Sequence, residues 1–523
     1  MQTALVLSAA VLFCAVCAAF AVPLSAAVLP VLGGGASRSI LRIFAAARFT
    51  LIQALLSAFA ASGIGLCAAF FCARREFFGR KWLMSLSAVP LSVPPVVIAL
   101  AFILFFGKNG MLNKVLLAVS SGTISTGTYL YSLGGVLLVH SFYNFPIAMR
   151  TVAAVWAQLP EETEQAAYLL GASPFRIFRT VTFPALKAPL FASFLIIFLY
   201  CFFSFVIILL LGGLGLTTLE VELYQAIRRD VHSVSAAWIA LIETGIAAAA
   251  VYIYLRLRSK TPDNTENTQY RRQRLKISGA QERLFFTAVA GVIVLCLILP
   301  LASLFVHSLA DPKTPLGFQA WKQLLSRPVF WTAVYRTVQV GIGTAALSVT
   351  AALFFAYRLW DAEKPAYRFI PFIPFTVSSI IIGSGWLRLD APPSMAMLIA
   401  AQASLAWPFA WTQIEAALAK IPHTAAEAAR LFSASRSDAF FRVILPLCKT
   451  GIASAFCSVF AVSAGDASLP LILHIPDFEN LALLLFRFAG AYRFAESAAI
   501  ALVLAVLTGL LFFIQDSLQD AAL

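Results

Sequence analysis

Long apolar stretches, separated by short polar segments, make up most of this chain. About 20 consecutive apolar residues form a helix long enough to cross a bilayer, and a helix satisfies its own backbone hydrogen bonds in lipid. The strict alternation of a transmembrane β-barrel is absent. The pattern therefore predicts an all-α polytopic membrane protein with about twelve transmembrane helices. The expected spans are residues 4–32, 47–72, 84–106, 131–150, 188–212, 236–256, 284–307, 332–357, 369–386, 395–414, 450–474 and 496–515.

Composition supports this class. Hydrophobic residues make up 61% of the chain and charged residues 12%, about half of the ~25% charge of a soluble domain. The mean hydropathy is +0.87. Such a chain has too little polar surface to be soluble at this size, so membrane lipid is an expected partner.

The basic residues are divided unevenly between the two sides of the predicted membrane. The loops near 74–82, 150–187, 256–283, 358–368 and 415–449 hold 24 of the 38 Lys and Arg residues. The positive-inside rule places these loops in the cytoplasm. Topology and anionic lipid account for most of the net charge of +14. No basic stripe with interleaved aromatic residues is present, so no nucleic-acid partner is expected.

One polar segment, residues 256–283, stands out from the apolar pattern. It holds eight basic and three acidic residues, as a solvated cytoplasmic linker does. It separates two units of six predicted helices, residues 1–255 and 284–523.

A loop motif occurs twice in the chain, 262 residues apart. The first copy is Gln165-Ala166-Ala167-x3-Gly171-x9-Val181-x-Phe183-Pro184. The second copy is Glu427-Ala428-Ala429-x3-Ser433-x9-Val443-x-Leu445-Pro446. Because twice this offset is almost the chain length of 523, the pattern indicates a tandem duplication. Both copies lie on the predicted cytoplasmic side, so the two units have parallel topology about an axis along the membrane normal.

Each motif predicts two short helices on a protruding loop. Pro160 and Pro422 suit helix starts, and Gly171 suits a left-handed helix end. Aromatic residues that include Phe175 and Phe440 follow, together with arginines. Such a loop suits docking into a groove on a partner; the alternative is an amphipathic loop that lies on the membrane. Two copies with the same spacing favour docking.

These loops resemble the EAA loops of binding-protein-dependent ABC importer permeases, whose pattern is EAA-x3-G-x9-I-x-LP. The chain departs from that pattern at Gln165, in the glutamate position, and at Ser433, in the glycine position. The resemblance implies the type I ABC importer transmembrane fold, tandem duplicated, with one coupling helix in each loop. The residues that it assigns to ATPase coupling are Gln165, Ala166, Ala167, Gly171, Phe175, Pro184, Glu427, Ala428, Ala429, Ser433, Phe440 and Pro446.

A fused double permease narrows the resemblance to thiamine and ferric-iron importers. The segments 106–110, 138–146, 211–213 and 217–227 are more similar to the thiamine-importer permease, although iron permeases share the segment around 219–222. The resemblance implies a bacterial inner-membrane location, two copies of an ABC ATPase that binds ATP and Mg, and a periplasmic or lipid-anchored solute-binding protein. The alternative cargo is ferric iron. A proton-coupled secondary transporter is a distant alternative, because it predicts carboxylate or histidine relays in several spans.

The chain lacks the motifs that would supply its own chemistry. No G-x4-G-K-[ST] motif is present, so ATP binding is expected on a separate subunit. Cys14 and Cys17 form a lone CxxC inside an apolar span, and the other Cys and His residues have no metal-ligand spacing. No nucleophile–base set is evident. We expect no catalytic residue, no metal and no cofactor on this chain.

A few polar and aromatic residues within the spans are candidates for the translocation path. Asp466 and Glu243 lie in predicted spans, where a charge costs about 2.5–3.5 kcal/mol or more. Asp466 either lines the path and meets a cationic substrate or forms a helix–helix hydrogen bond. For Glu243 and His140 we favour packing and hydrogen bonding. Tyr200 and Phe203 belong to an aromatic run that suits cation–π contact with a cationic ring, or simply faces lipid.

One external segment adds a further hypothesis. Residues 220–224 and their counterparts at 482–486 either contact a docked solute-binding protein or act as an outer gate. The second copy lacks both acids of the first.

Overall fold

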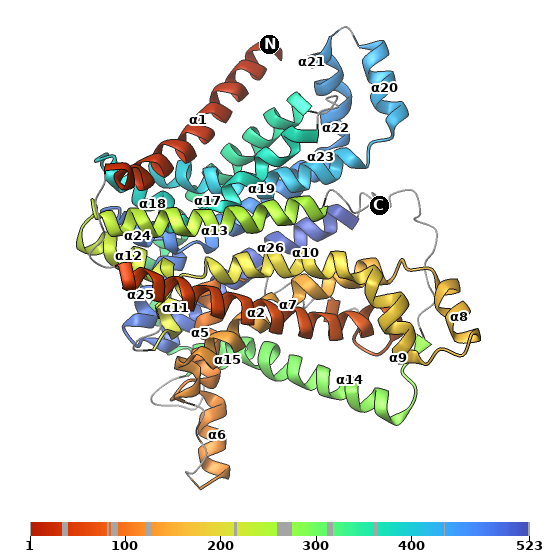
Figure 1. Cartoon of the computed structure of the whole chain (residues 1–523). Helices are drawn as coiled ribbons and strands as arrows, with labels where there is room; N and C mark the ends of the chain where they lie inside the picture. Colours follow the sequence, from red (N-terminus) through yellow and green to blue (C-terminus); the bar gives the residue numbers. More distant parts are fainter. Residues whose placement is uncertain are drawn as a thin grey trace.

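The computed structural model describes residues 2–33, 40–80, 83–84, 93–121, 125, 127–213, 217–258, 275–310, 317–359, 365–433 and 435–520. Nearly all of the described chain is helical (Figure 1). The only strands in these ranges are β1 (Arg75–Glu76) and β2 (Leu275–Lys276), which pair in parallel. The all-α polytopic fold is confirmed, while most of the predicted linker lies outside the described residues.

The helices follow in the same order in the two halves. Those of the first half are α1 (Gln2–Val28), α2 (Ile40–Arg74), α5 (Pro95–Phe106), α6 (Met111–Val119), α7 (Leu133–Trp156), α8 (Glu161–Leu169), α9 (Pro174–Ile177), α10 (Phe183–Phe202), α11 (Val206–Leu211), α12 (Leu219–Arg229) and α13 (Val234–Arg258). Those of the second half are α14 (Ala280–Ile293), α15 (Leu299–Ser308), α16 (Gln319–Leu325), α17 (Pro328–Leu359), α18 (Ser379–Arg388), α19 (Met395–Ala419), α20 (His423–Phe432), α21 (Arg436–Ala439), α22 (Leu445–Leu447), α23 (Lys449–Gly465), α24 (Ser468–Leu473), α25 (Leu481–Gly490) and α26 (Phe494–Asp520).

Turns of other helix types join several of these helices. The 3₁₀ turns are η1 (Leu29–Gly33), η2 (Tyr129–Tyr131) and η6 (Pro365–Thr376). The π turns are η3 (Phe178–Thr182), η5 (Val294–Ile298) and η7 (Phe440–Ile444).

Eight helical segments of the described chain are long and apolar enough to cross a membrane, or ten if each of two bent pairs counts as one span. The predicted spans 131–150 and 395–414 are outside this set, although α7 and α19 have 24 and 25 residues. α7 packs along α2 and α10, and α19 packs against α17 and α23. These two helices contact other helices over much of their surface, which permits more polar side chains than lipid contact does.

Three predicted spans are broken rather than continuous: 369–386, where η6 and α18 meet at a bend of 84°, and also 188–212 and 450–474. α10 ends at Phe202 and α23 ends at Gly465, and the short helices α11 and α24 follow after a few non-helical residues. Asp466 therefore lies at the break and not in the middle of a span, which corrects the sequence prediction. The average hydropathy of these stretches is high on both sides of the break, so the apolar pattern did not reveal it.

The duplication is visible in the element order. Seven pairs of elements begin at positions 262 residues apart: α7 and α19, α8 and α20, α9 and α21, η3 and η7, α10 and α22, α11 and α24, and α12 and α25. Earlier in each half the offset is larger, because residues 107–132 of the first half correspond to the shorter connection 389–394. The longer connection carries α6, which projects away from the helix bundle (Figure 1).

The first span of each half packs on the other half; it is α1 in the first half, and α14 continued by α15 in the second. α1 lies against α17, α18 and α19, whereas α15 lies against α5 as well as α26 (Figure 1). Gly385 in α18 permits the first of these contacts, because a Cβ there would come within 1.9 Å of the backbone oxygen of Pro23 in α1. The two halves are therefore interlocked through their first spans.

Gly385→Ala is expected to lower the thermal unfolding temperature of the purified protein in detergent. Overpacking of a tight contact costs about 1–3 kcal/mol, and here the added methyl group meets backbone atoms. Gly245→Ala in α13 is the matched control, because nothing lies within 4 Å of a Cβ at that position. Its melting temperature should be unchanged or slightly higher. Equal melting temperatures for Gly385→Ala and the wild type would contradict the packing of α1 on α18.

Candidate functional site

The two motif loops lie at the same end of the helix bundle, and α12 and α25 lie at the opposite end (Figure 1). Helices α8 and α20 begin directly after Pro160 and Pro422, as predicted. Gly171 ends the first loop helix with the predicted left-handed backbone, at φ +81°. Ser433 instead has extended backbone, at φ −91° and ψ 143°. A side chain disfavours the left-handed conformation, so the second loop ends its helix in a different way.

Most of the predicted coupling residues are accessible at the loop surface. Gln165, Ala166, Phe175, Pro184, Glu427 and Pro446 are exposed, whereas Ala167, Ala428 and Ser433 are half-buried and Ala429 is buried. Phe175 has 73% of its surface exposed, so its ring is available to a partner. The structure thus groups the predicted residues within each loop.

Phe440 does not fit the predicted surface role. It is only 3% exposed, and its ring packs edge-on against Tyr357 of α17 with centroids 5.2 Å apart. The repeat offset pairs Phe440 with Phe178, which packs on Trp156 in the first half. Phe440 therefore supports the second loop from within, and a partner cannot contact its side chain. The sequence could not show which side of this short turn faces the bundle.

Exposed apolar residues that the motif does not name stand at the ends of α8 and α20. Leu169 and Leu170 are 86% and 88% exposed, and their counterparts Leu431 and Phe432 are 80% and 88% exposed. They occupy the unspecified positions just before Gly171 and Ser433. The sequence signal for this exposed surface is the pair of adjacent large apolar residues before Gly171 and before Ser433. We call Leu169 and Leu170 the first tip pair, and Leu431 and Phe432 the second tip pair.

The first loop is held to α2 by an ion pair. Arg74, near the cytoplasmic end of α2, donates to Glu164 through two nitrogen atoms, one of them at 2.8 Å from Oε1. The hydroxyl of Thr182 donates to the same oxygen at 2.7 Å. Because Glu164 is 8% exposed, this bidentate contact is largely screened from water and fixes the position of α8.

The second loop is held in another way, since position 426 is alanine. Arg436 donates to the backbone oxygens of Tyr357 and Arg358 at 3.2 and 3.0 Å, at the end of α17. Its guanidinium also lies 5.5 Å from the centre of the Tyr357 ring. A cation is favourable at the negative end of a helix dipole. Each loop is thus attached to the long helix of its own half, by a carboxylate in one case and by carbonyl groups in the other.

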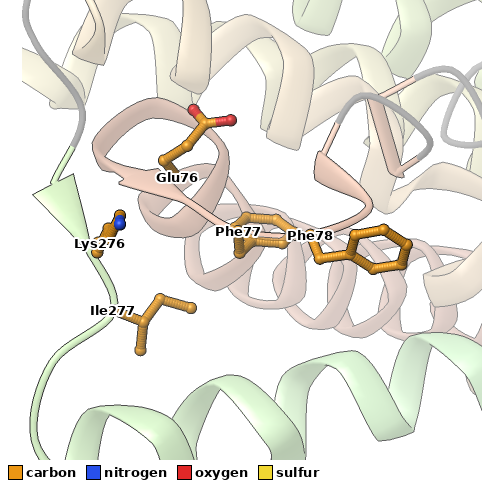
Figure 2. A pocket seen from close by; sticks show the side chains of 5 residues that line it. All are labelled: Glu76, Phe77, Phe78, Lys276 and Ile277. Atoms are coloured by element: carbon orange, nitrogen blue, oxygen red, sulfur yellow. The ribbon is translucent and has the colours of Figure 1, made fainter.

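The end of α2 also holds the start of the second half. Arg75 pairs with Glu282 of α14, and β1 pairs with β2 directly beside it. A surface hollow of about 520 Å³ lies there, lined by Glu76, Phe77, Phe78, Lys276 and Ile277 (Figure 2). Arg74 at the end of α2 and Arg75 at the start of β1 therefore contact the first loop and α14, so movement of the loop is linked to the junction between the halves.

Polar side chains gather at the helix breaks within the bundle. In the first half His140 lies 3.3 Å from the hydroxyl of Ser57 and 2.9 Å from that of Ser204. The prediction of a packed, hydrogen-bonded His140 is confirmed. In the second half the Gln402 side chain donates to Asp466 Oδ2 at 3.0 Å and accepts from Thr344 at 3.2 Å.

The remaining path candidates lie near the first break. Tyr200 is 44% exposed and Phe203 is half-buried at the end of α10, where its ring packs edge-on against Phe202. Asp466 is half-buried. These three residues stay predictions as path residues, because their accessibility alone does not define a passage.

The acids of the external segment face inward. Glu220 is 1% exposed, and Glu222 is 6% exposed and pairs with Arg42 at 2.9 Å. Burial raises the pKa of the Glu220 carboxyl, which lies beside the buried Glu243. The side chains of these two acids are therefore not exposed to a docked protein in this structure, and the gate role of residues 220–224 stays a prediction.

A duplicated bundle of long apolar helices with a repeated loop at one end is the architecture of a membrane-spanning transport subunit. The model of the family "Binding-protein-dependent transport system inner membrane component" matches residues 61–314 and 324–522. The chain belongs to this family and is a multi-pass inner-membrane permease. The family assignment confirms the predicted class and location.

Several relatives are similar over nearly the whole chain. The thiamine transport system permease protein ThiP of Brucella abortus is 28% identical over 487 residues, which cover 90% of this chain and 87% of the relative. ThiP of Escherichia coli strain K12 is 27% identical over 492 residues, with 90% and 88% coverage. The sulfate transport system permease protein CysW of Synechocystis is 34% identical over 142 residues, which cover 27% of this chain and 49% of the relative.

Glu164→Gln is expected to loosen the first loop, because Arg74 then keeps its charge without a carboxylate partner. Loss of a hydrogen bond to a buried charged group costs about 1–3 kcal/mol. Amide hydrogen exchange over residues 161–182 should become roughly tenfold faster or more. Glu162→Gln, an exposed residue of the same helix, should leave exchange unchanged. Identical exchange in the two variants would show that the ion pair does not hold the loop.

Proposed function

We propose that the chain is the permease of an ATP-driven importer that takes up thiamine or its phosphates. The observation that supports this cargo is the full-length similarity to thiamine permeases, which covers 90% of this chain and extends through both halves. The sulfate permease is more similar, but only over 142 residues. That match covers 27% of this chain and 49% of the sulfate permease, whereas the thiamine matches cover most of both chains. Ferric iron is the alternative cargo.

The energy for transport would come from an ABC ATPase that binds ATP and Mg, with one ATPase subunit on each loop. The two tip pairs supply apolar surface at equivalent positions, and large apolar groups at the centre of an interface contribute most of its binding energy. Exposed Gln165 and Glu427 would lie at the polar rim. A periplasmic or lipid-anchored solute-binding protein would deliver the cargo at the opposite end of the bundle.

Alternating access follows from this arrangement. ATP binding would draw the two ATPase subunits together, and the attached loops would approach each other. α8 would move the end of α2 through Arg74, and α21 would move the end of α17 through Arg436. Such a cycle requires that nucleotide favours one of two conformations of the permease. Hydrolysis would then restore the first conformation.

Thiamine is expected to stimulate ATP hydrolysis by the complete transporter in lipid. The experiment combines the chain with the ATPase and the solute-binding protein encoded beside it, and compares thiamine with ferric iron. Stimulation of about tenfold or more by thiamine alone is the expected result. Stimulation by iron alone would overturn the cargo and retain the importer class.

Leu170→Asp and Phe432→Asp are each expected to weaken ATPase binding, because either change introduces a charge into an apolar contact. Loss of a central interface contact costs about 2 kcal/mol or more, which is at least a thirtyfold loss of affinity. Co-purification of the ATPase with the permease measures the effect. Phe78→Asp is the control, since Phe78 is fully exposed but lies outside both loops. Equal retention of the ATPase by all three variants would exclude the tip pairs as the docking surface.

A further inference from the structure

The polar groups at the two helix breaks are equivalent positions of the duplicated fold. His140 and Ser204 correspond to Gln402 and Asp466 at an offset of 262 residues. Ser57 and Thr344 correspond at an offset of 287. The same larger offset relates Thr50 and Thr337, whose hydroxyls accept hydrogen bonds from the backbone N–H groups of Leu219 and Leu481, both at 2.9 Å. We call Ser57, His140 and Ser204 the first cluster, and Thr344, Gln402 and Asp466 the second cluster.

Each cluster joins three segments in the same order. A hydroxyl from the long helix α2 or α17 contacts a side chain of α7 or α19. That side chain contacts the residue at the break of the core helix. The shared geometry means that both clusters hold a broken helix in place. The second cluster in addition caps the start of α24 through the Asp466 carboxylate.

The chemical difference between the two clusters is a charge. Ser204 is neutral, whereas Asp466 is a carboxylic acid. Its Oδ1 accepts the backbone N–H groups of Ser468 and Leu469 at 2.8 and 3.4 Å, and its Oδ2 accepts from Gln402 at 3.0 Å. These three donors hold the Asp466 side chain in one orientation. Among the described residues, none of the Lys, Arg or His side chains forms an ion pair with Asp466.

The second break faces the first half. Gly465, the residue before Asp466, packs so closely on Pro94 at the start of α5 that an added Cβ would come within 2.7 Å of that ring. Asp466 is half-buried rather than sealed in the core. Asp466 accepts hydrogen bonds from neutral donors and lies next to the contact between the halves. These donors do not neutralise its negative charge, and a bound cation can do so.

We propose that Asp466 binds the positively charged part of the substrate as it passes between the two halves. Only the second half supplies a carboxylate at this position. The proposal rests on the proposed function, because the thiazolium ring of thiamine carries a fixed positive charge. The counterpart of Asp466 in the first half is the neutral Ser204, so the first half supplies no anion at the equivalent position. A single carboxylate favours entry of one cation and its release, whereas two facing carboxylates would hold it more strongly.

The decisive experiment replaces the second cluster with the chemistry of the first. Gln402→His combined with Asp466→Ser rebuilds the hydroxyl–histidine–serine arrangement and removes the carboxylate, which carries the charge and caps the start of α24. In the complete transporter, the thiamine concentration for half-maximal uptake should rise at least about tenfold, with the maximal rate within about threefold of the wild type. A structural role alone would lower the maximal rate or the amount of folded protein and leave the half-maximal concentration unchanged.

Two controls separate charge from packing. Ser204→Ala removes the hydroxyl at the equivalent neutral position, and its half-maximal thiamine concentration should match that of the wild type. An N-alkylated thiazolium should inhibit wild-type uptake more strongly than a neutral thiazole of similar shape, and the double variant should lose this preference. An unchanged half-maximal concentration in the double variant, or an unchanged preference for the thiazolium, would refute the binding role of Asp466. The proposed cargo would not be affected by that result. A wild-type transporter that does not respond to thiamine would overturn the proposed cargo instead.

Discussion

The constraint on which this structure depends is that a helix broken inside a membrane must find hydrogen-bond partners within the protein. α10 ends at Phe202 and α23 ends at Gly465, and helical backbone resumes as α11 and α24. Side chains from neighbouring helices fill the gap at both places, with Ser204 bound to His140 and Asp466 bound to Gln402. The backbone of the following segments is bound by Thr50 and Thr337. Without these long-range partners the re-entrant segments at the outer end could not be held in place.

The opposite end of the bundle uses stronger but fewer contacts. Arg74 and Arg436 each attach a short loop helix to the end of a long helix. Because α1 and α15 pack across the two halves, displacement of one loop is transmitted to both halves and not to its own half alone. The fold therefore places rigid polar attachments at both ends of helices that are otherwise packed through small and apolar side chains.

Much of this arrangement could be predicted from the sequence. The apolar stretches located the spans, the repeated motif located both loops, and Pro160, Pro422 and Gly171 gave the helix starts and one helix end. The breaks were not predicted, since the stretches on both sides are apolar enough on average to be read as one span, although Gly465 and Asp466 mark the second break. The partners Arg74 and Glu164 stand 90 residues apart in sequence, and no local pattern relates them. The burial of Phe440 depended on which face of a single turn meets α17, which the spacing of aromatic residues leaves open.

The covalent union of the two halves has an evolutionary consequence. In a permease assembled from two identical chains, every substitution near the symmetry axis appears on both sides at once. A new carboxylate would then face its own copy, and a longer connection such as residues 107–132 would occur twice. In this chain a substitution affects only the half in which it occurs. The two halves can therefore acquire different roles while the shared framework is retained. Ser204 and Asp466 are one product of that freedom, and α6 is another.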